Sequence, residues 1–170
     1  MKIETERLIL KEIDESHVED ILKIRSNEVV NQFVKRIPPK TNYDALDFIL
    51  TIKKRVQNNE SLNWGISYKN QQNLIGTICL WKFSDDRTEA EVGYELLPEY
   101  HRKGLMSEAV TAVLNYGFNE LNLHEILAFT NKFNENSKGL LLKYDFVLQE
   151  GRIDDGFPDN LVFSKKYNGI

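Results

Sequence analysis

A short apolar segment in the middle of this chain leads through a basic turn into a helix. The segment Glu91–Leu97 ends at Pro98, which has no backbone N–H and cannot continue the hydrogen bonding of a strand. The turn carries Arg102 and Lys103, and apolar residues at helical spacing then continue to about Asn119. A strand, a turn and a helix N-terminus in this order present free N–H groups at the positive end of the helix dipole. With two added cations, this pattern indicates that an anion such as phosphate binds there.

The rest of the chain is predicted from its hydrophobic periodicity and its turn residues. Strands are expected at 5–13, 62–68, 74–83, 91–97, 125–130, 147–152 and 161–167. Helices are expected at 18–25, 27–33, 42–58, 105–119 and 134–144, the first of them with Ser16 and Glu19 at capping-box spacing.

A helix joins the strands expected at 91–97 and 125–130, so these two should be parallel neighbours, whereas the remaining neighbours should be antiparallel. The glycine pattern of a doubly wound nucleotide-binding fold is absent from the sequence. The predicted fold class is therefore α/β, with a mixed, mostly antiparallel sheet of about seven strands flanked by helices.

The composition is that of one globular domain, here 1–170, with 41% hydrophobic and 28% charged residues. The formal net charge of -4 argues against a nucleic-acid-binding surface. No apolar run approaches the roughly 20 residues that span a membrane, and no signal peptide is evident. Cys79 is the single cysteine and cannot form an internal disulfide, so a reducing, cytoplasmic setting is expected. His17, His101 and His124 have no metal-ligand spacing, so no metal is expected.

The basic turn and several other short motifs follow one another in a characteristic order. The turn reads His101-Arg102-Lys103-Gly104-Leu105-Met106. The other motifs are Thr5–Leu10, Leu74–Thr77, Glu91–Tyr94, Asn134–Ser137 and Lys143–Phe146. This order resembles the GNAT superfamily of N-acetyltransferases, and within it the Rim-type ribosomal-protein N-terminal acetyltransferases. The acyl-CoA loop of that superfamily is usually Gln/Arg-x-x-Gly-x-Gly/Ala, so the central glycine is shared and the first and last positions differ.

The resemblance implies that acetyl-CoA is the co-substrate. The loop amides and the neighbouring cations would hold its diphosphate, and a free backbone edge between two splayed parallel strands would pair with its pantetheine arm. Asn134 would hydrogen-bond the same arm. The implied coenzyme-binding residues are Leu96, Leu97, His101, Arg102, Lys103, Gly104, Leu105, Met106, Ser107 and Asn134.

Amide formation from a thioester needs a neutral amine, a donor to the thioester oxygen and a proton for the leaving sulfur. The backbone N–H of Leu96 or Leu97 is the expected donor to the oxygen. Many relatives use a tyrosine four residues after the Ser137 position to protonate the sulfur, but that residue is Leu141 here. The resemblance to the Rim-type branch, where a serine matching Ser137 is implicated instead, implies this role for Ser137. The alternative is that Ser137 and Asn134 only cap the helix that they begin.

Two carboxylates are candidates for the base that takes the proton of the amine. Glu91 and Glu95 fall on one face of the strand expected at 91–97, so both could point into a cleft and act through water. The alternative is that they face solvent or pair with a lysine. Glu150 and Asp159 are further candidates, and the resemblance favours an acidic residue at Asp159.

The sequence thus predicts an acetyl-CoA-dependent N-acetyltransferase in which a primary amine attacks the thioester directly in a ternary complex. An acetylated Cys79 is disfavoured, since this thiol lies in an apolar run without a histidine partner. The resemblance implies the α-amine of a protein N-terminus as acceptor. A small-molecule amine such as a polyamine or an antibiotic, and a module that binds acyl-CoA without turnover, are the alternatives. Nucleic-acid and membrane partners are not expected, and the chain would be a monomer or a homodimer.

Overall fold

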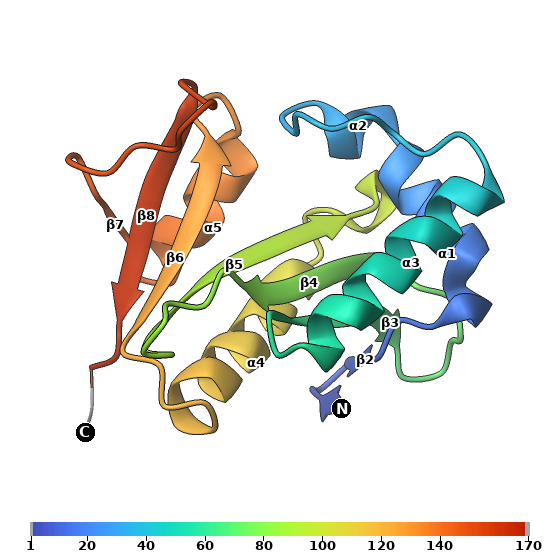
Figure 1. The fold of residues 1–170 in the computed structure, drawn as a ribbon, viewed down its shortest axis with the longest axis horizontal. Coiled ribbons are helices and arrows are strands. Elements are labelled where there is room, and N and C mark those ends of the chain that lie inside the picture. Colours follow the sequence, from blue (N-terminus) through green and yellow to red (C-terminus); the bar gives the residue numbers. More distant parts are fainter. Residues whose placement is uncertain (1, 169–170) are drawn as a thin grey trace.

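The computed structural model describes residues 2–168, which form one mixed sheet with helices on both of its faces (Figure 1). The strands are β1 Ile3–Glu4, β2 Leu8–Lys11, β3 Ser61–Tyr68, β4 Gly76–Trp81, β5 Glu89–Leu96, β6 Glu125–Asn131, β7 Val147–Leu148 and β8 Asn160–Lys166. The α-helices are α1 Val18–Ser26, α2 Glu28–Asn31, α3 Asn42–Gln57, α4 Leu105–Asn119 and α5 Glu135–Lys143. Two short 3-10 turns, η1 Glu15–His17 and η2 Pro98–Tyr100, precede α1 and α4. None of the helices within 2–168 is long and apolar enough to cross a membrane.

The sheet has the order β1-β2-β3-β4-β5-β6-β8-β7, and every neighbouring pair is antiparallel except β5 with β6. This confirms the predicted mixed, mostly antiparallel sheet with one parallel pair. Eight strands form where about seven were expected. The difference arises at the N-terminus, because the Thr5 amide donates to the carbonyl of Leu8 and the Leu8 amide donates to the Thr5 hydroxyl, and these bonds turn the chain. The segment predicted as one strand therefore becomes part of a hairpin.

The parallel pair separates soon after it begins. Its register runs only from Glu89 opposite Glu125 to Glu91 opposite Leu127. Beyond these residues β5 continues to Leu96 and β6 continues to Asn131, and the two strands point in clearly different directions (Figure 1). The backbone edges that face each other across this gap have no strand between them.

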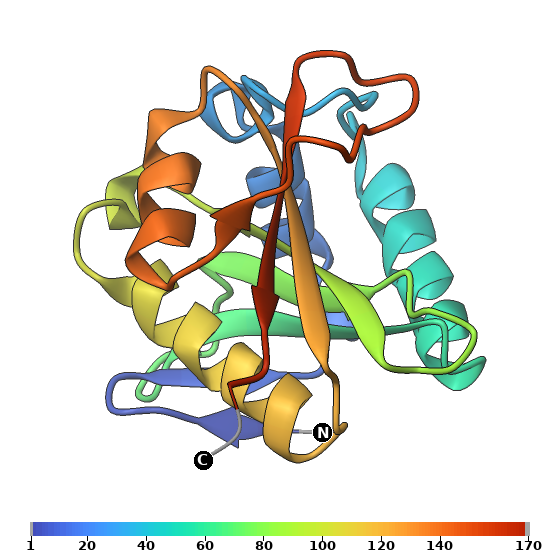
Figure 2. The same ribbon diagram turned by 90° about the vertical axis from the view of Figure 1, so that its left-hand side faces the viewer.

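Two apolar cores cover the two faces of the sheet. On one face α4 buries residues at i, i+4, i+5 and i+8, namely Leu105, Ala109, Val110 and Val113. On the other face α1 and α3 pack together through residues that include Ile21, Ile24, Ala45 and Ile49. Figure 2 shows α3 on one side of the sheet and α4 and α5 on the other.

Two predicted local features differ from the structure. The capping box at the first helix is formed by Asp14 and His17 around η1, not by Ser16 and Glu19, because the Asp14 carboxylate accepts from both the amide and the hydroxyl of Ser16. The strand predicted at 147–152 is only two residues long, since the amide of Arg152 turns back to the carbonyl of Gln149.

Candidate active site

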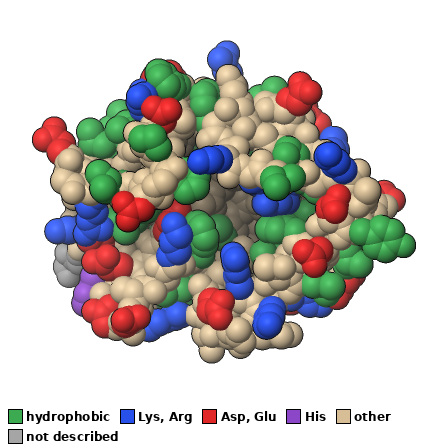
Figure 3. All heavy atoms as spheres, turned by 45° about the horizontal axis from the view of Figure 1, so that its top comes forward, with side chains coloured by type: hydrophobic (Ala, Val, Ile, Leu, Met, Phe, Trp, Pro, Cys, Tyr) green, Lys and Arg blue, Asp and Glu red, His purple; other side chains and the backbone are tan. Residues whose placement is uncertain are grey.

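A cavity of about 1090 Å³ lies where β5 and β6 separate. Both strands line it, and so do the first turn of α4, the helix α5, the segment around α2 and the loop between β7 and β8. Figure 3 shows the hollow near the centre of one face of the molecule, with Lys and Arg side chains around it. The cavity thus reaches segments on both faces of the sheet, which suits two substrates that meet in the gap.

The turn before α4 holds its amides open toward one end of the cavity. Arg102 and Gly104 have left-handed backbone conformations, with φ values of 58° and 73°. Gly104 is the N-cap of α4, and no side chain caps this helix. Within 2–168, none of the amides from Arg102 to Ser107 donates a hydrogen bond to a carbonyl, whereas the amide of Glu108 bonds Gly104. Free N–H groups at a helix N-terminus form an anion site.

The hairpin of β1 and β2 supports the turn before α4 through Arg7 and Thr5, which lie between the two strands. The Arg7 guanidinium donates to the carbonyl of Lys103 at 2.9 Å and to Glu108 Oε2 at 2.7 Å. The amide of Arg7 and the hydroxyl of Thr5 donate to Glu108 Oε1. Burial opposes ionisation of Glu108, but these hydrogen bonds outweigh it and hold the pKa of the carboxyl below its ordinary value. The carboxylate therefore remains charged in the first turn of α4, where the helix dipole favours it.

The helix α5 adds a cation to the same end of the cavity. Lys143 Nζ donates to Ser107 Oγ at 3.2 Å, and the Tyr144 hydroxyl donates to the carbonyl of Ser107 at 2.9 Å. Lys143 and Arg102 both line the cavity. Lys143 was not predicted for this role, because its proximity to α4 depends on how two helices that are distant in the sequence pack together.

Leu96 and Leu97, at the end of β5, were both predicted to face the coenzyme, but their backbone groups have different partners. The amide of Leu97 donates to the carbonyl of Ile75 at 2.9 Å, its carbonyl accepts from Tyr100, and its side chain is buried in the core. Leu97 is therefore fully engaged in the fold, which corrects the prediction that its backbone is open to a ligand. Successive strand residues direct their backbone groups to opposite edges, so Leu96 faces the gap. Its carbonyl accepts a hydrogen bond from His101 Nε2 at 2.8 Å, so this ring nitrogen carries a proton.

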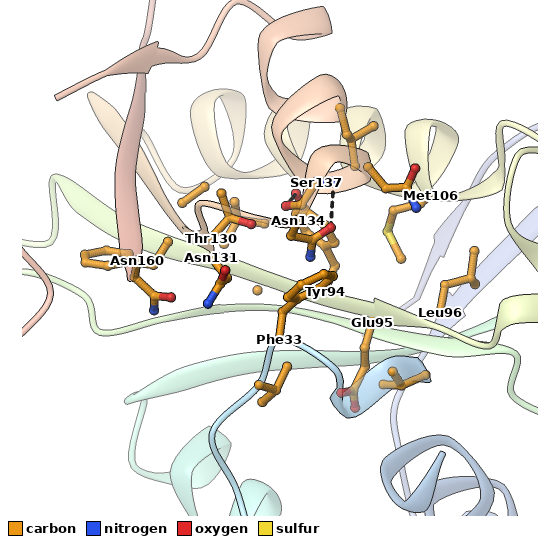
Figure 4. Close-up of a pocket in the computed structure, with 18 of the residues that line it drawn as sticks. Phe33, Tyr94, Glu95, Leu96, Met106, Thr130, Asn131, Asn134, Ser137 and Asn160 are labelled. Carbon is orange, nitrogen blue, oxygen red and sulfur yellow. Dashed lines mark hydrogen bonds between the residues drawn. The ribbon is translucent and has the colours of Figure 1, made fainter. Parts of the chain in front are cut away.

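Two hydroxyl groups meet between β5 and α5. Tyr94 Oη and Ser137 Oγ are 2.9 Å apart, and both residues line the cavity. Burial raises the pKa of Tyr94 to about 12, against a smaller effect of the Ser137 hydrogen bond. The Asn134 carboxamide caps α5 by accepting from the amide of Ser137 at 3.1 Å, so the Ser137 hydroxyl is not needed for the cap. Figure 4 shows Tyr94 directed toward Ser137 and Asn134.

The carboxylates of Glu91 and Glu95 both line the cavity, but their surroundings differ. Lys82 Nζ lies 2.9 Å from Glu91 Oε2, and burial raises the pKa of Glu91 although the lysine opposes that shift. Glu95 instead lies between two guanidinium groups, at 2.7 Å from Arg36 and 3.4 Å from Arg25. In Figure 4 the Glu95 carboxylate points to the side of β5 away from Ser137.

The other candidate carboxylates are less central. Asp159 lines the cavity and pairs with Lys132 at 2.6 Å, whereas Glu150 is exposed and does not line it. Within 2–168, no group of three or more His, Cys, Asp or Glu side chains is arranged to hold a metal ion.

This geometry agrees with what comparisons with known proteins show. An acetyltransferase (GNAT) domain is recognised over residues 7–147. The chain belongs to the GNAT acetyltransferase family. The Bacillus subtilis N-acetyltransferase YoaA is 35% identical over 167 residues, which cover 95% of this chain and 94% of YoaA. The chain is accordingly an N-acetyltransferase of a family that uses acetyl-CoA.

Solved structures share the fold of this GNAT chain over its whole length. A RimL ribosomal L7/L12 α-N-protein acetyltransferase in complex with coenzyme A is 16% identical, with a TM-score of 0.84 and 98% of both chains covered. A ribosomal-protein-S5-alanine acetyltransferase from Vibrio fischeri is 23% identical, with a TM-score of 0.78 and coverage of 99% of this chain and 97% of that chain. These likenesses confirm the fold.

The structure brings most of the predicted site residues of this GNAT domain to one cavity. Those that line it are Glu91, Glu95, Leu96, His101, Arg102, Gly104, Leu105, Met106, Ser107, Asn134 and Ser137. Lys103 is in the same turn and is held through its carbonyl. Tyr94 also lines the cavity but was not among the predicted site residues. The alternation of side chains along β5 places Tyr94 on the same face as Val92 and Leu96, and that signal was available.

Proposed function

We propose that this acetyltransferase transfers the acetyl group of acetyl-CoA to the α-amine of a protein N-terminus, by direct attack in a ternary complex. The observation that supports this most directly is the shape of the cavity. It extends from the open amides before α4, through the gap between β5 and β6, to carboxylates and exposed apolar side chains beyond the gap. Acetyl-CoA, which supplies the thioester, would enter from the first end and the amine from the other.

The residues at the first end fit the coenzyme. The amides of 102–107 and the side chains of Arg102 and Lys143 suit phosphate oxygens, because charge-assisted hydrogen bonds of this kind are short and strong. The gap-facing edge of Leu96 and the Asn134 side chain suit an arm that carries amide groups. The amide of Leu96 is also the candidate donor to the thioester oxygen.

Direct attack of the amine on the thioester, without an acetylated cysteine, is supported by the burial of the single cysteine, Cys79. Cys79 lies on β4 opposite Gly93, and a Cβ placed on that glycine would approach its sulfur to 3.2 Å. Burial raises the pKa of the Cys79 thiol to about 12. A thiol in that state is protonated at neutral pH and is a poor nucleophile.

We assign the base to Glu91 and a positioning role to Glu95. A general base works best when its pKa is close to the working pH, and burial moves the pKa of Glu91 upward in that direction. Glu95 is held by Arg25 of α1 and by Arg36 of the segment that follows α2. Glu95 therefore anchors α1 and the segment after α2, which form the wall of the cavity where the amine would enter, to β5.

Substitution of Glu91 tests this assignment. We expect Glu91→Gln to lower kcat by about 10² or more and to remove the acidic limb of its pH profile. Lys82 lowers the pKa of Glu91, so Lys82→Met should move that limb to higher pH. Glu95→Gln should keep the acidic limb of the pH profile, since Glu95 positions the wall of the cavity and does not take the proton of the amine. The measurement is initial thiol release from acetyl-CoA between pH 5 and 9. A Glu91→Gln profile with the wild-type limb would contradict the assignment.

A polypeptide acceptor is supported by the rim of the cavity. Val29 and Val34 are 53% and 45% exposed, Phe157 is 38% exposed, and all three line the cavity. Exposed apolar side chains around a cleft are typical of sites that bind other proteins. The two ribosomal-protein acetyltransferases that share the fold support the same class of acceptor.

An amine panel separates this acceptor from the alternatives. Thiol release should occur with short peptides that carry a free α-amine, and should be lost when the α-amine is blocked and only lysine amines remain. Preferential release with a polyamine such as spermidine would overturn the protein acceptor. Stabilisation by CoA, about 2.7 kcal/mol at 100 times the dissociation constant, checks coenzyme binding without turnover.

A further inference from the structure

The hydroxyl pair in the gap contains two candidate proton donors with different chemistry. Ser137 is the one hydroxyl residue of α5, and Leu141, one turn further, is buried in the core. Tyr94 approaches from the opposite side, on β5, and its oxygen is 2.9 Å from Ser137 Oγ. A phenol is a much stronger acid than an aliphatic alcohol, so the tyrosine is the better donor of the two.

The place of Tyr94 follows from the separation of the strands. Pairing of β5 with β6 stops at Glu91, three residues before Tyr94, so no strand lies beside it on that edge. Side-chain alternation directs Tyr94 to the face that carries α5. Asn134 caps α5 and fixes the amide of Ser137, which sets the position of the serine hydroxyl. The Tyr94 hydroxyl is thus placed in the gap by its own strand, β5, and by its hydrogen bond to Ser137 of α5.

We propose that Tyr94 is the catalytic acid, which gives its proton to the leaving sulfur, and that Ser137 is the positioning residue that holds the phenol hydroxyl. This rests on the proposed function, since the gap must receive the thioester. Tyr94 is fully protonated at neutral pH, because burial raises its pKa to about 12. It is therefore able to donate a proton and unable to act as a base.

The step balances without a further reactant. The carbon–sulfur bond breaks with its electron pair on sulfur, and the Tyr94 proton moves to the sulfur to give the free thiol. The amine nitrogen forms the new bond to the acetyl carbon and loses its proton through Glu91. The phenolate recovers a proton from water, and Glu91 releases one to water.

The test compares Tyr94→Phe, Ser137→Ala and the control Tyr116→Phe. Tyr116 lies on α4, and its ring packs edge-on against Trp64 of β3, away from the pair formed by Tyr94 and Ser137. We expect Tyr94→Phe to lower kcat for peptide acetylation about 100-fold with little change in KM for acetyl-CoA. Ser137→Ala should lower kcat less, and the control should keep wild-type kinetics. Unchanged circular dichroism and thermal unfolding would establish that each variant is folded.

A second measurement separates a catalytic role from a structural one. The ultraviolet absorbance of the thiolate reports the pKa of the thiol of CoA bound to the enzyme. A donor to the sulfur stabilises its anion, so Tyr94→Phe should raise that pKa and Tyr116→Phe should not. Wild-type kcat in Tyr94→Phe, an unchanged thiol pKa, or a larger kcat loss in Ser137→Ala would each overturn the proposal. A wild-type enzyme without turnover on any amine would instead contradict the proposed function.

Discussion

A Gly104→Val variant is expected to fold and to lose at least about 100-fold in affinity for acetyl-CoA. Gly104 has a φ of 73°, where a β-branched residue is strained. A Cβ at this position would also lie 3.4 Å from Arg7 Nη2, so the valine would press on the guanidinium that holds the turn and shift its amides. A hydrogen bond to a charged group contributes about 1.5–3 kcal/mol, so the loss of two of them accounts for the expected change. Isothermal titration with CoA measures the affinity directly.

The matched control for this variant is Gly151→Val. Gly151 is exposed, and a Cβ placed on it would meet no atom within 4 Å. This variant should bind CoA as the wild type does. If Gly104→Val also kept wild-type affinity, the diphosphate would bind elsewhere, and the assignment of the turn before α4 would be wrong.

The turn itself was predictable because its signals are local. A strand that ends at Pro98, a glycine and a helix follow one another within a few residues, and each acts through its own backbone. The parallel pair was predictable for a similar reason, since one helix connects its strands. Asn134 was also predicted to face the coenzyme, and the structure places it at the start of α5 on the cavity.

The contacts that complete the site were not predictable, because they join residues far apart in the sequence. Arg7 reaches the turn before α4 only because the N-terminal hairpin lies next to that helix in the folded chain. Tyr94 and Ser137 are 43 residues apart, and their contact depends on where β5 separates from β6. The hydrogen bond from Leu97 to Ile75 likewise depends on where β4 begins and β5 ends. Periodicity assigns a residue to a face but does not identify its partner.

Where the start of β4 pairs with the end of β5, there is no room for a side chain at Gly76. A Cβ placed on Gly76 would collide with the carbonyl oxygen of Glu95 and would lie 2.9 Å from Leu96 Cδ1. The first contact is with backbone that pairs across the sheet, so it cannot be relieved by rotation of a side chain. We expect Gly76→Ala to lower the free energy of unfolding by about 2–4 kcal/mol. Urea denaturation followed by circular dichroism measures this change.

Gly139→Ala is the matched control, because it makes the same substitution in the middle of α5, where a Cβ would meet no atom within 4 Å. Alanine is favoured over glycine in a helix by about 1 kcal/mol, so this variant should be as stable as the wild type or more stable. The effect of Gly76→Ala should extend to activity, since a shift of Glu95 and Leu96 moves both the wall of the amine side and the edge that faces the coenzyme. An alanine at this position with wild-type stability and turnover would show that β4 and β5 do not approach each other as closely as this geometry requires.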